Sequence, residues 1–322
     1  MTMKAIKYEK YGGPEVLKMV ETQKPKPTEN QILIRVISSS VTAADWHLRK
    51  ADPFMVRIMN GMFKPKNQVL GQEFSGEIVE VGSNVTQFKI GELVFGNTSM
   101  KTGAYAEYIV LDEDSVITRI PKNIHPDKVA TAPIGALTAL HFLREAGIKS
   151  GQKVLVNGAS GSVGTYAVQI AKVFGAEVTG VSSTSNMKMV QLNGADHVID
   201  YKKMSIQVYG DTYDIIFDTV GNLDFDEMKS ILTDQGYFTS TAFNPSLILK
   251  MMFNKKDGPK LYTGVTNEKR EDLETIARMI SAGDVKPVID KSYEMEEIRE
   301  AHTYVESGRK RGNVIIKIGE VA

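Results

Sequence analysis

The segment from Lys153 to Gly164 carries the residue pattern with the clearest chemical meaning. An apolar run, Lys153-Val-Leu-Val156, meets a turn in which Ala159, Gly161 and Gly164 hold the spacing of a dinucleotide-binding fingerprint, with alanine in the first position. Such a turn presents backbone N–H groups and a helix N-terminus to a pyrophosphate. Glycines can also punctuate an ordinary surface turn, but a strand before this turn and a helix after it favour a nucleotide site. The residues predicted to bind the dinucleotide here are Ala159, Ser160, Gly161, Ser162, Val163 and Gly164.

The end of the next predicted strand, Glu177–Val181, indicates which dinucleotide binds. Folds that bind NAD usually place a carboxylate here to hold the ribose 2′-hydroxyl. This chain has Ser182, Ser183 and Thr184 instead, and Lys188 lies one turn further on. Hydroxyl groups and a lysine suit the additional negative charge of a 2′-phosphate. The pattern therefore predicts NADPH, although Lys188 alone could equally be a solvated helix lysine.

The composition excludes several other chemistries. The chain has no cysteine, which removes disulfides, a thiolate nucleophile and every zinc site that needs sulfur. Its histidines are scattered without metal-ligand spacing, so we predict no metal site and interpret each of them as structural or exposed. Lys+Arg and Asp+Glu are equal at 39 each, without a long basic run, which argues against nucleic acid as a partner. The histidines are His47, His125, His141, His197 and His302.

The elements that must position these residues follow from the order of patterns along the chain. Short alternating runs before residue 120, punctuated by Gly and Pro, predict a small β-barrel or sandwich. After Pro121, strands alternate with helices, which predicts a doubly wound parallel sheet. The chain closes on a strand-like run from Asn313 to Ile318. No apolar stretch is long enough to span a membrane, and the charged start resembles no signal peptide, so we expect a cytoplasmic protein.

Several ordered motifs resemble those of the medium-chain dehydrogenase/reductases, and in particular their zinc-free quinone oxidoreductase branch, which is also called zeta-crystallin-like. They are Tyr11-Gly-Gly-Pro-Glu-Val-Leu17, Gly71-Gln-Glu-Phe-Ser-Gly76, Gly103-Ala-Tyr-Ala-Glu-Tyr108, Gly135-Ala-Leu-Thr-Ala-Leu140 and the glycine turn itself. The resemblance implies a GroES-like catalytic domain at 1–124 and 266–322 and an inserted Rossmann domain at 125–265. Zinc-dependent relatives carry a histidine where this chain has Gln72. A homodimer, formed through the last strand of the Rossmann sheet, is also implied.

The resemblance further implies site residues outside the glycine turn. Thr138, Tyr201, Val220, Phe243 and Asn313 match positions close to the cofactor.

Thr42, Trp46 and His47 match the segment beside the nicotinamide. Thr42 could donate a hydrogen bond to nicotinamide or substrate, Trp46 could stack on a flat substrate, and His47 could donate a proton. Alternatively Trp46 is core, Asp45 caps a helix and His47 faces solvent. The proton donor is therefore left unassigned.

The predicted reaction is NADPH-dependent reduction of a quinone or an α,β-unsaturated carbonyl, because the oxygen of such an acceptor takes the negative charge without zinc. The cofactor would carry the hydride. Two apolar stretches, Phe54–Phe63 and Ser246–Phe253, could line the substrate mouth or be helix core. The alternatives are a zinc-independent alcohol or aldehyde oxidoreductase and a catalytically silent NADPH-binding protein. A short-chain-type enzyme is disfavoured, since no tyrosine has a lysine four residues later.

Overall fold

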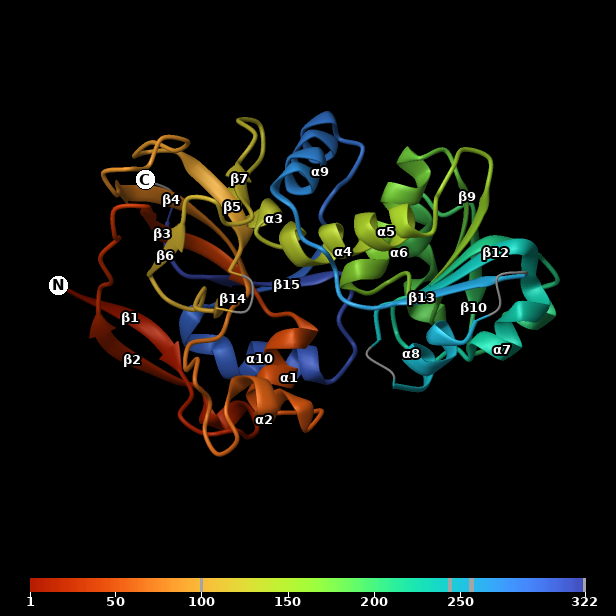
Figure 1. The fold of residues 1–322 in the computed structure, drawn as a ribbon, viewed down its shortest axis with the longest axis horizontal. Coiled ribbons are helices and arrows are strands. Elements are labelled where there is room, and N and C mark those ends of the chain that lie inside the picture. Colours follow the sequence, from red (N-terminus) through yellow and green to blue (C-terminus); the bar gives the residue numbers. More distant parts are fainter. Residues whose placement is uncertain (99–100, 243–244, 255–257, 321–322) are drawn as a thin grey trace. The chain divides into compact units, whose positions relative to one another are not determined.

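The computed structural model describes residues 1–98, 101–242, 245–254 and 258–320, and they divide into two compact units (Figure 1). Unit 1 comprises Met1–Ile134, Lys269–Ser281 and Pro287–Ala322, and unit 2 comprises Gly135–Glu268 and Ala282–Lys286. Unit 2 is therefore inserted in the sequence of unit 1. The predicted domain limits, 124/125 and 265/266, lie within ten residues of the main divisions between the units. The exact domain limits stay a prediction.

Unit 2 contains a six-stranded sheet in which every pairing is parallel, in the order β10-β9-β8-β11-β12-β13. Figure 1 shows α5 and α6 on one side of this sheet and α7 and α8 on the other, which is a doubly wound arrangement. The strands are β8 (Lys153–Asn157), β9 (Glu177–Ser182), β10 (His197–Asp200), β11 (Tyr213–Asp218), β12 (Leu232–Ser240) and β13 (Lys260–Thr263). The helices are α4 (Ala132–Glu145), α5 (Ser162–Val173), α6 (Met187–Leu192), α7 (Phe225–Met228) and α8 (Pro245–Met252). The first residues of α4, up to Ile134, belong to unit 1.

One core of unit 2 lies between the sheet and the helices α7 and α8. Leu155, Ile216, Phe238 and Leu261 are paired across four neighbouring strands and form one buried row on that face. The row packs against buried side chains of both helices, among them Phe225. Strands that are covered on both faces read as continuous apolar runs, which is why the sequence reveals them so clearly.

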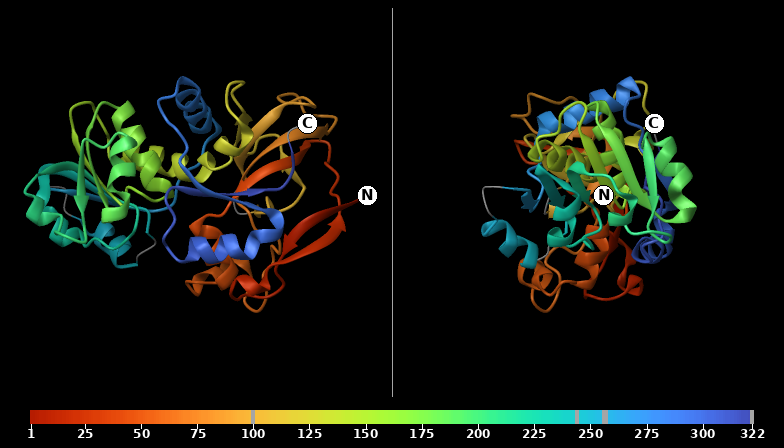
Figure 2. Two further views of the ribbon diagram at one scale, coloured as in Figure 1. Left: turned by 180° about the vertical axis from the view of Figure 1, so that it is seen from behind. Right: turned by 90° about the vertical axis from the view of Figure 1, so that its right-hand side faces the viewer.

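Unit 1 is built on a seven-stranded sheet in which the C-terminal strands pair with the N-terminal ones. Its order is β14-β15-β3-β4-β5-β7, with β6 also pairing with β3, and β1 and β2 form a separate antiparallel hairpin (Figure 2). The strands are β1 (Thr2–Lys7), β2 (Lys18–Gln23), β3 (Gln31–Ser40), β4 (Glu73–Val81), β5 (Leu93–Asn97), β6 (Tyr108–Asp112), β7 (Ile117–Arg119), β14 (Ile289–Glu294) and β15 (Asn313–Lys317). The helices are α1 (Ala43–Lys50), α2 (Met55–Asn60), α3 (Pro126–Val129), α9 (Arg270–Ala282) and α10 (Ile298–Glu306).

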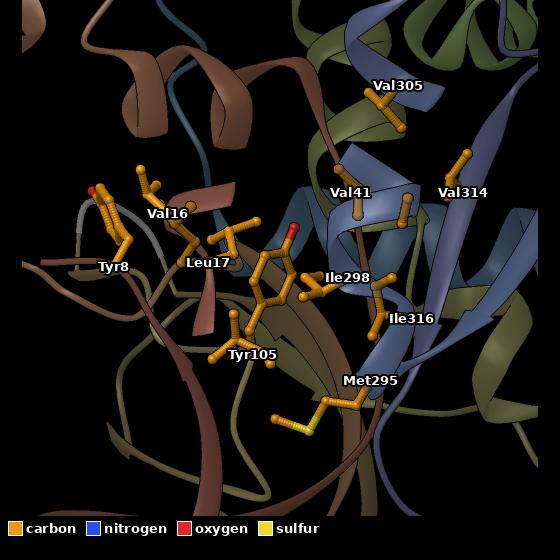
Figure 3. Close-up of a cluster of buried hydrophobic side chains, with 13 residues drawn as sticks. Tyr8, Val16, Leu17, Val41, Tyr105, Met295, Ile298, Val305, Val314 and Ile316 are labelled. Atoms are coloured by element: carbon orange, nitrogen blue, oxygen red, sulfur yellow. The ribbon is translucent and has the colours of Figure 1, made fainter. Parts of the chain in front are cut away.

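A cluster of buried side chains joins α10 and β15 to the N-terminal part of unit 1 (Figure 3). Tyr8 and Tyr105 are almost completely buried in it, and the same cluster contains Ile298 of α10 and Ile316 of β15. The final segment of the chain is therefore part of this core, as the resemblance implied. The predicted fold class, a GroES-like domain with an inserted Rossmann sheet, is confirmed.

Three details of the sequence prediction differ from the structure. The sequence from Lys128 to Ala146, followed by Gly147, predicts one helix, but the structure divides this region into α3 and α4. The run leading into Gly91 alternates apolar and polar residues and so predicts a strand, but the structure has no strand there. Strand β14 was not predicted, because only one of its residues, Ile289, is aliphatic and the rest are polar or aromatic.

Candidate functional site

The glycine turn between β8 and α5 has the geometry that a pyrophosphate site requires. A Cβ atom at Gly164 would stand 2.1 Å from the carbonyl oxygen of Gly158, so only glycine permits this packing of helix on strand. A Cβ at Gly161 would meet only that same oxygen, at 3.4 Å, so the space in front of Gly161 is open. Gly161 is the N-cap of α5 and makes no side-chain capping hydrogen bond to the first turn of that helix. The turn therefore combines close packing at one glycine with open access at the other.

The remaining residues of the turn are placed around this opening. Ala159 is buried and its N–H donates to the carbonyl of Val181 at 3.0 Å, which ties the turn to β9. Ser160, Ser162 and Val163 are half-buried. The hydroxyl of Ser160 accepts a hydrogen bond from the Asn186 amide at 3.1 Å.

A second loop, which follows β11, is held beside the glycine turn by a buried carboxylate. Asp218 accepts hydrogen bonds from the backbone N–H groups of Val220, Gly221 and Leu223 at 3.0, 2.9 and 3.1 Å. It also accepts one from the Asn157 amide at 2.8 Å. Val220 is 57% exposed, and its side chain would be 2.5 Å from a Cβ at Gly158, so it borders the turn; its contact with the cofactor stays a prediction.

The predicted phosphate-recognition residues gather where β9 ends, with one addition that the sequence did not reveal. Ser182 is buried, Ser183 is half-buried and Lys188 on α6 is exposed. The parallel register places Asp200 of β10 opposite Ser182. The Thr184 hydroxyl donates to the Asp200 carboxylate at 2.6 Å, and this bond holds the pKa of Asp200 below its ordinary value. A charged carboxylate therefore occupies this region, although it comes from the following strand.

The other cofactor positions taken from the resemblance have different surroundings. Tyr201 is 59% exposed beside the end of β10. Thr138 on α4 accepts a hydrogen bond from the Thr266 hydroxyl at 3.2 Å. Asn313 is buried in unit 1, where its amide donates to the Val288 carbonyl at 3.0 Å. Phe243 lies outside the described residues.

In unit 1, the predicted nicotinamide segment forms the start of α1, and its polar groups hold the local structure. Thr42 is the N-cap and forms a capping box with Asp45. The Thr42 hydroxyl donates to the buried Asp45 carboxylate at 2.7 Å, and that carboxylate also accepts from the Gly71 N–H at 3.1 Å. Asp45 is thus a helix cap, and the hydroxyl proton of Thr42 is already used within the cap.

Trp46 and His47 stack on each other, with ring centroids 3.6 Å apart. Trp46 also packs against the buried cluster of Figure 3. His47 is half-buried, and its Nδ1 lies 2.6 Å from the Asp52 carbonyl, a distance at which Nδ1–H donates to that oxygen. Nδ1 of His47 is therefore already used in a hydrogen bond within the protein.

A cavity of about 120 Å³ lies in unit 1 next to α2. Leu48 and Met59 supply its apolar walls. Its polar walls come from Tyr8, Asn60, Asn67, Gln72 and Thr102. Gln72 is the residue at the zinc-ligand position of zinc-dependent relatives. Sequence reasoning missed the cavity because its residues are distant in the chain.

A buried carboxylate, Glu73, adjoins this region. It accepts hydrogen bonds from the Ser40 hydroxyl and from the Ile134 N–H at 2.8 Å, in the first turn of α4. Burial raises the pKa of Glu73 to about 7, since water is excluded from its charged form. The residue is therefore placed to titrate near neutral pH, although it is 1% exposed.

Both apolar stretches that are candidates for the substrate mouth carry exposed large side chains. Phe54, Ile58 and Phe63 are exposed around α2, as are Leu249 and Phe253 around α8. The helix-core alternative is therefore wrong for the large side chains around α2, but it holds in part for α8, where Leu247 is buried in the core of unit 2 and Met251 packs against it. In the described part of the chain, no three His, Asp or Glu side chains come together in a way that could hold a metal ion. Among the helices that the structure describes, none is long and apolar enough to cross a bilayer.

Comparisons with known proteins agree with this architecture. Residues 28–122 match the alcohol dehydrogenase GroES-like domain, and residues 193–316 match a zinc-binding dehydrogenase model. The chain is 31% identical to a 2-methylene-furan-3-one reductase of Solanum lycopersicum, over 98% of this chain and 79% of that protein. It is 30% identical to a chloroplast envelope quinone oxidoreductase homolog of Arabidopsis thaliana, over 98% of each. The solved quinone oxidoreductase of Coxiella burnetii superposes with a TM-score of 0.90 at 28% identity, over 99% of this chain and 100% of that one.

Proposed function

Since the chain belongs to the medium-chain dehydrogenase/reductase family, in its quinone oxidoreductase branch, we propose that it reduces a quinone or an α,β-unsaturated carbonyl with NADPH. The observation that carries the proposal is the glycine turn, where Gly161 faces open space and Gly164 packs without room for a side chain. The names of the relatives, which include a quinone oxidoreductase and a reductase of an unsaturated ketone, support the acceptor class.

In this proposal the turn Ala159–Gly164 binds the pyrophosphate through backbone N–H groups and the N-terminus of α5. Val220 borders the turn, and Thr138, Phe243 and Asn313 are proposed as further contacts on the strength of the resemblance. When bound, the cofactor supplies the hydride.

We propose NADPH rather than NADH because hydroxyl groups follow β9 directly in the sequence and an exposed lysine lies in the next helix, α6. Ser182, Ser183, Lys188 and Tyr201 are the proposed partners of the 2′-phosphate. The Asp200 carboxylate opposes this preference, but the Thr184 hydroxyl and the Lys202 N–H already bind it, at 2.6 and 3.0 Å. These two hydrogen bonds engage the Asp200 carboxylate within the protein and so weaken its repulsion of an incoming phosphate.

The proposed reaction proceeds without zinc. The donor set supports this, because the chain has no cysteine and carries the neutral amide of Gln72 at the position of a zinc-ligand histidine. A quinone or enone accepts negative charge on its own oxygen, so hydrogen-bond donors can replace a Lewis acid. We expect activity to survive prolonged incubation with EDTA.

A homodimer formed through β13 is the proposed assembly. β13 is an edge strand of the sheet in unit 2 and pairs only with β12 among the described residues. Such an edge offers unpaired backbone groups to a second copy. Light scattering at micromolar concentration tests the dimer, and a monomer would refute it.

The cytoplasm stays the predicted compartment, which cell fractionation would test.

The decisive experiment measures NADPH oxidation at 340 nm with a panel of small quinones, enones, aldehydes and alcohols, and repeats it with NADH. We expect turnover with quinones or enones and a strong preference for NADPH. Activity confined to aldehydes or alcohols would favour the zinc-independent alcohol dehydrogenase alternative. Tight NADPH binding without any turnover would make the chain a silent cofactor-binding protein.

A further inference from the structure

The cavity beside α2 contains two polar groups that the protein's own structure leaves available. The Asn60 amide donates to the Tyr8 hydroxyl oxygen at 2.9 Å, and the Asn60 carbonyl accepts from the Asn67 N–H at 3.3 Å. Because Tyr8 accepts from Asn60, its own proton is free for another acceptor. Tyr8 is 1% exposed, so its ring is fixed by the core around it.

Gln72 supplies the second group. Its backbone is fixed, since the Gln72 carbonyl accepts from the Thr98 N–H at 2.7 Å. Its side-chain amide makes no hydrogen bond to any residue in the described part of the chain, and it lines the same cavity as Tyr8. A carboxamide that is half-buried without a protein partner is available to a ligand in that cavity.

We propose that the Tyr8 hydroxyl and the Gln72 carboxamide are a pair of hydrogen-bond donors that bind the carbonyl oxygen of the acceptor in this cavity. This inference rests on the reductase function proposed above. In the reaction, a C–H bond forms at the acceptor's β-carbon with the hydride's electron pair. The C=C electron pair then shifts onto the carbonyl oxygen, and the resulting enolate takes a proton from water. The acceptor gains two electrons, and NADPH becomes NADP⁺.

Both donors meet the requirements of such a site. Burial raises the pKa of Tyr8 above its ordinary value, so the hydroxyl remains a donor throughout the working pH range. Gln72 is neutral and cannot lose its donor by titration. A volume of about 120 Å³ is well below the roughly 300–1,000 Å³ of sites for drug-sized ligands. The cavity therefore accepts a carbonyl on one small ring or short chain.

The test uses the full-length protein with Gln72→Leu, Gln72→Glu and Tyr8→Phe. Each donor bonds to a developing negative charge, so removing one should lower kcat for a small enone by about 10-fold or more. Gln72→Glu keeps the shape but places a carboxylate near the enolate oxygen, so it should be slower than Gln72→Leu. NADPH affinity, which is measured separately, should not change. Gln23→Leu and Tyr293→Phe are the matched controls, because Gln23 is exposed on β2 and Tyr293 lies on β14 away from the cavity.

A second readout needs no cofactor. 4-Nitrophenol is a small ring whose phenolate oxygen resembles the enolate oxygen, and the yellow phenolate band reports its ionisation. The wild type should bind the phenolate, and each donor variant should bind it about 10-fold more weakly, while the controls match the wild type. If the donor variants match the controls in both phenolate affinity and kcat, the proposal is overturned. If the wild type oxidises no NADPH with any acceptor, the reductase function fails, and the phenolate data alone decide whether these donors form a site.

Discussion

His302 provides a direct test of the packing in unit 1, because its titratable ring is buried without a hydrogen-bond partner among the described residues. It is 0% exposed on α10, and within the described residues neither ring nitrogen has a hydrogen-bond partner. The ring contacts Tyr105 edge to face, with centroids 5.8 Å apart. Burial, assisted by the nearby charge of Arg49, lowers the pKa of His302 from 6.5 to about 3. The neutral ring is therefore the folded form near neutral pH.

The magnitude follows from proton linkage. When folding lowers the pKa of a base, the base does not reduce the free energy of unfolding at a pH above its unfolded pKa. As the pH falls below that value, the folded protein loses stability. Between pH 6.5 and pH 5 the cost of keeping His302 neutral is about 2 kcal/mol, from 1.36 kcal/mol per pH unit. His302→Leu removes this cost. Its advantage in unfolding free energy over the wild type should therefore grow by about 2 kcal/mol between pH 7.5 and pH 5.

The assay is urea unfolding followed by the fluorescence of Trp46, the only tryptophan, which packs against the same cluster. Other groups, including Glu73, titrate in the same way in both proteins. Their contribution therefore cancels in the difference in unfolding free energy between variant and wild type. The control is His125→Asn, which removes an exposed histidine and retains an N-cap acceptor for α3. If the difference between His302→Leu and wild type were independent of pH, the ring would be charged or hydrogen-bonded in the folded state and the reasoning would be wrong.

The other predictions concern the cofactor site and the buried carboxylate. Gly161→Ala should keep the melting temperature and weaken NADPH binding about 10-fold or more, because its Cβ would occupy the pyrophosphate approach; equal affinity would refute the assignment. Gly164→Ala should instead lower the melting temperature, because its Cβ would stand 2.1 Å from the Gly158 carbonyl oxygen. Lys188→Ala should weaken NADPH binding several-fold, by roughly 1 kcal/mol, and leave NADH binding unchanged in titration calorimetry. Burial raises the pKa of Glu73, so the protein loses stability as pH rises from 4.5 to about 7, by up to about 3 kcal/mol; Glu73→Gln should remove that loss, and urea unfolding at pH 5 and pH 8 measures it.

The sequence predicts unit 2 better than unit 1 for a physical reason. Its parallel strands are buried on both faces, so each reads as an apolar run between turn residues. In unit 1, β14 pairs with β15 at the edge of the sheet and carries mostly polar residues, so its sequence resembles a loop. The glycine turn was found because all its residues are consecutive.

Several parts of the site that sequence reasoning missed depend on register or on residues that are distant in the chain. Asp200 reaches the end of β9 only because β10 pairs in parallel, with Asp200 opposite Ser182. Tyr8 and Gln72 line one cavity although 64 positions separate them in the chain. Asp218 did give a local signal, because it is an acidic residue at the end of an apolar strand and just before a glycine loop.

The measurement that most directly tests the central claim is the rate of NADPH oxidation by the purified protein with a small quinone or enone, compared with NADH under the same conditions. The account predicts turnover that persists after EDTA treatment and is strongly faster with NADPH. An absence of NADPH oxidation across the acceptor panel, or faster oxidation of NADH, would contradict it.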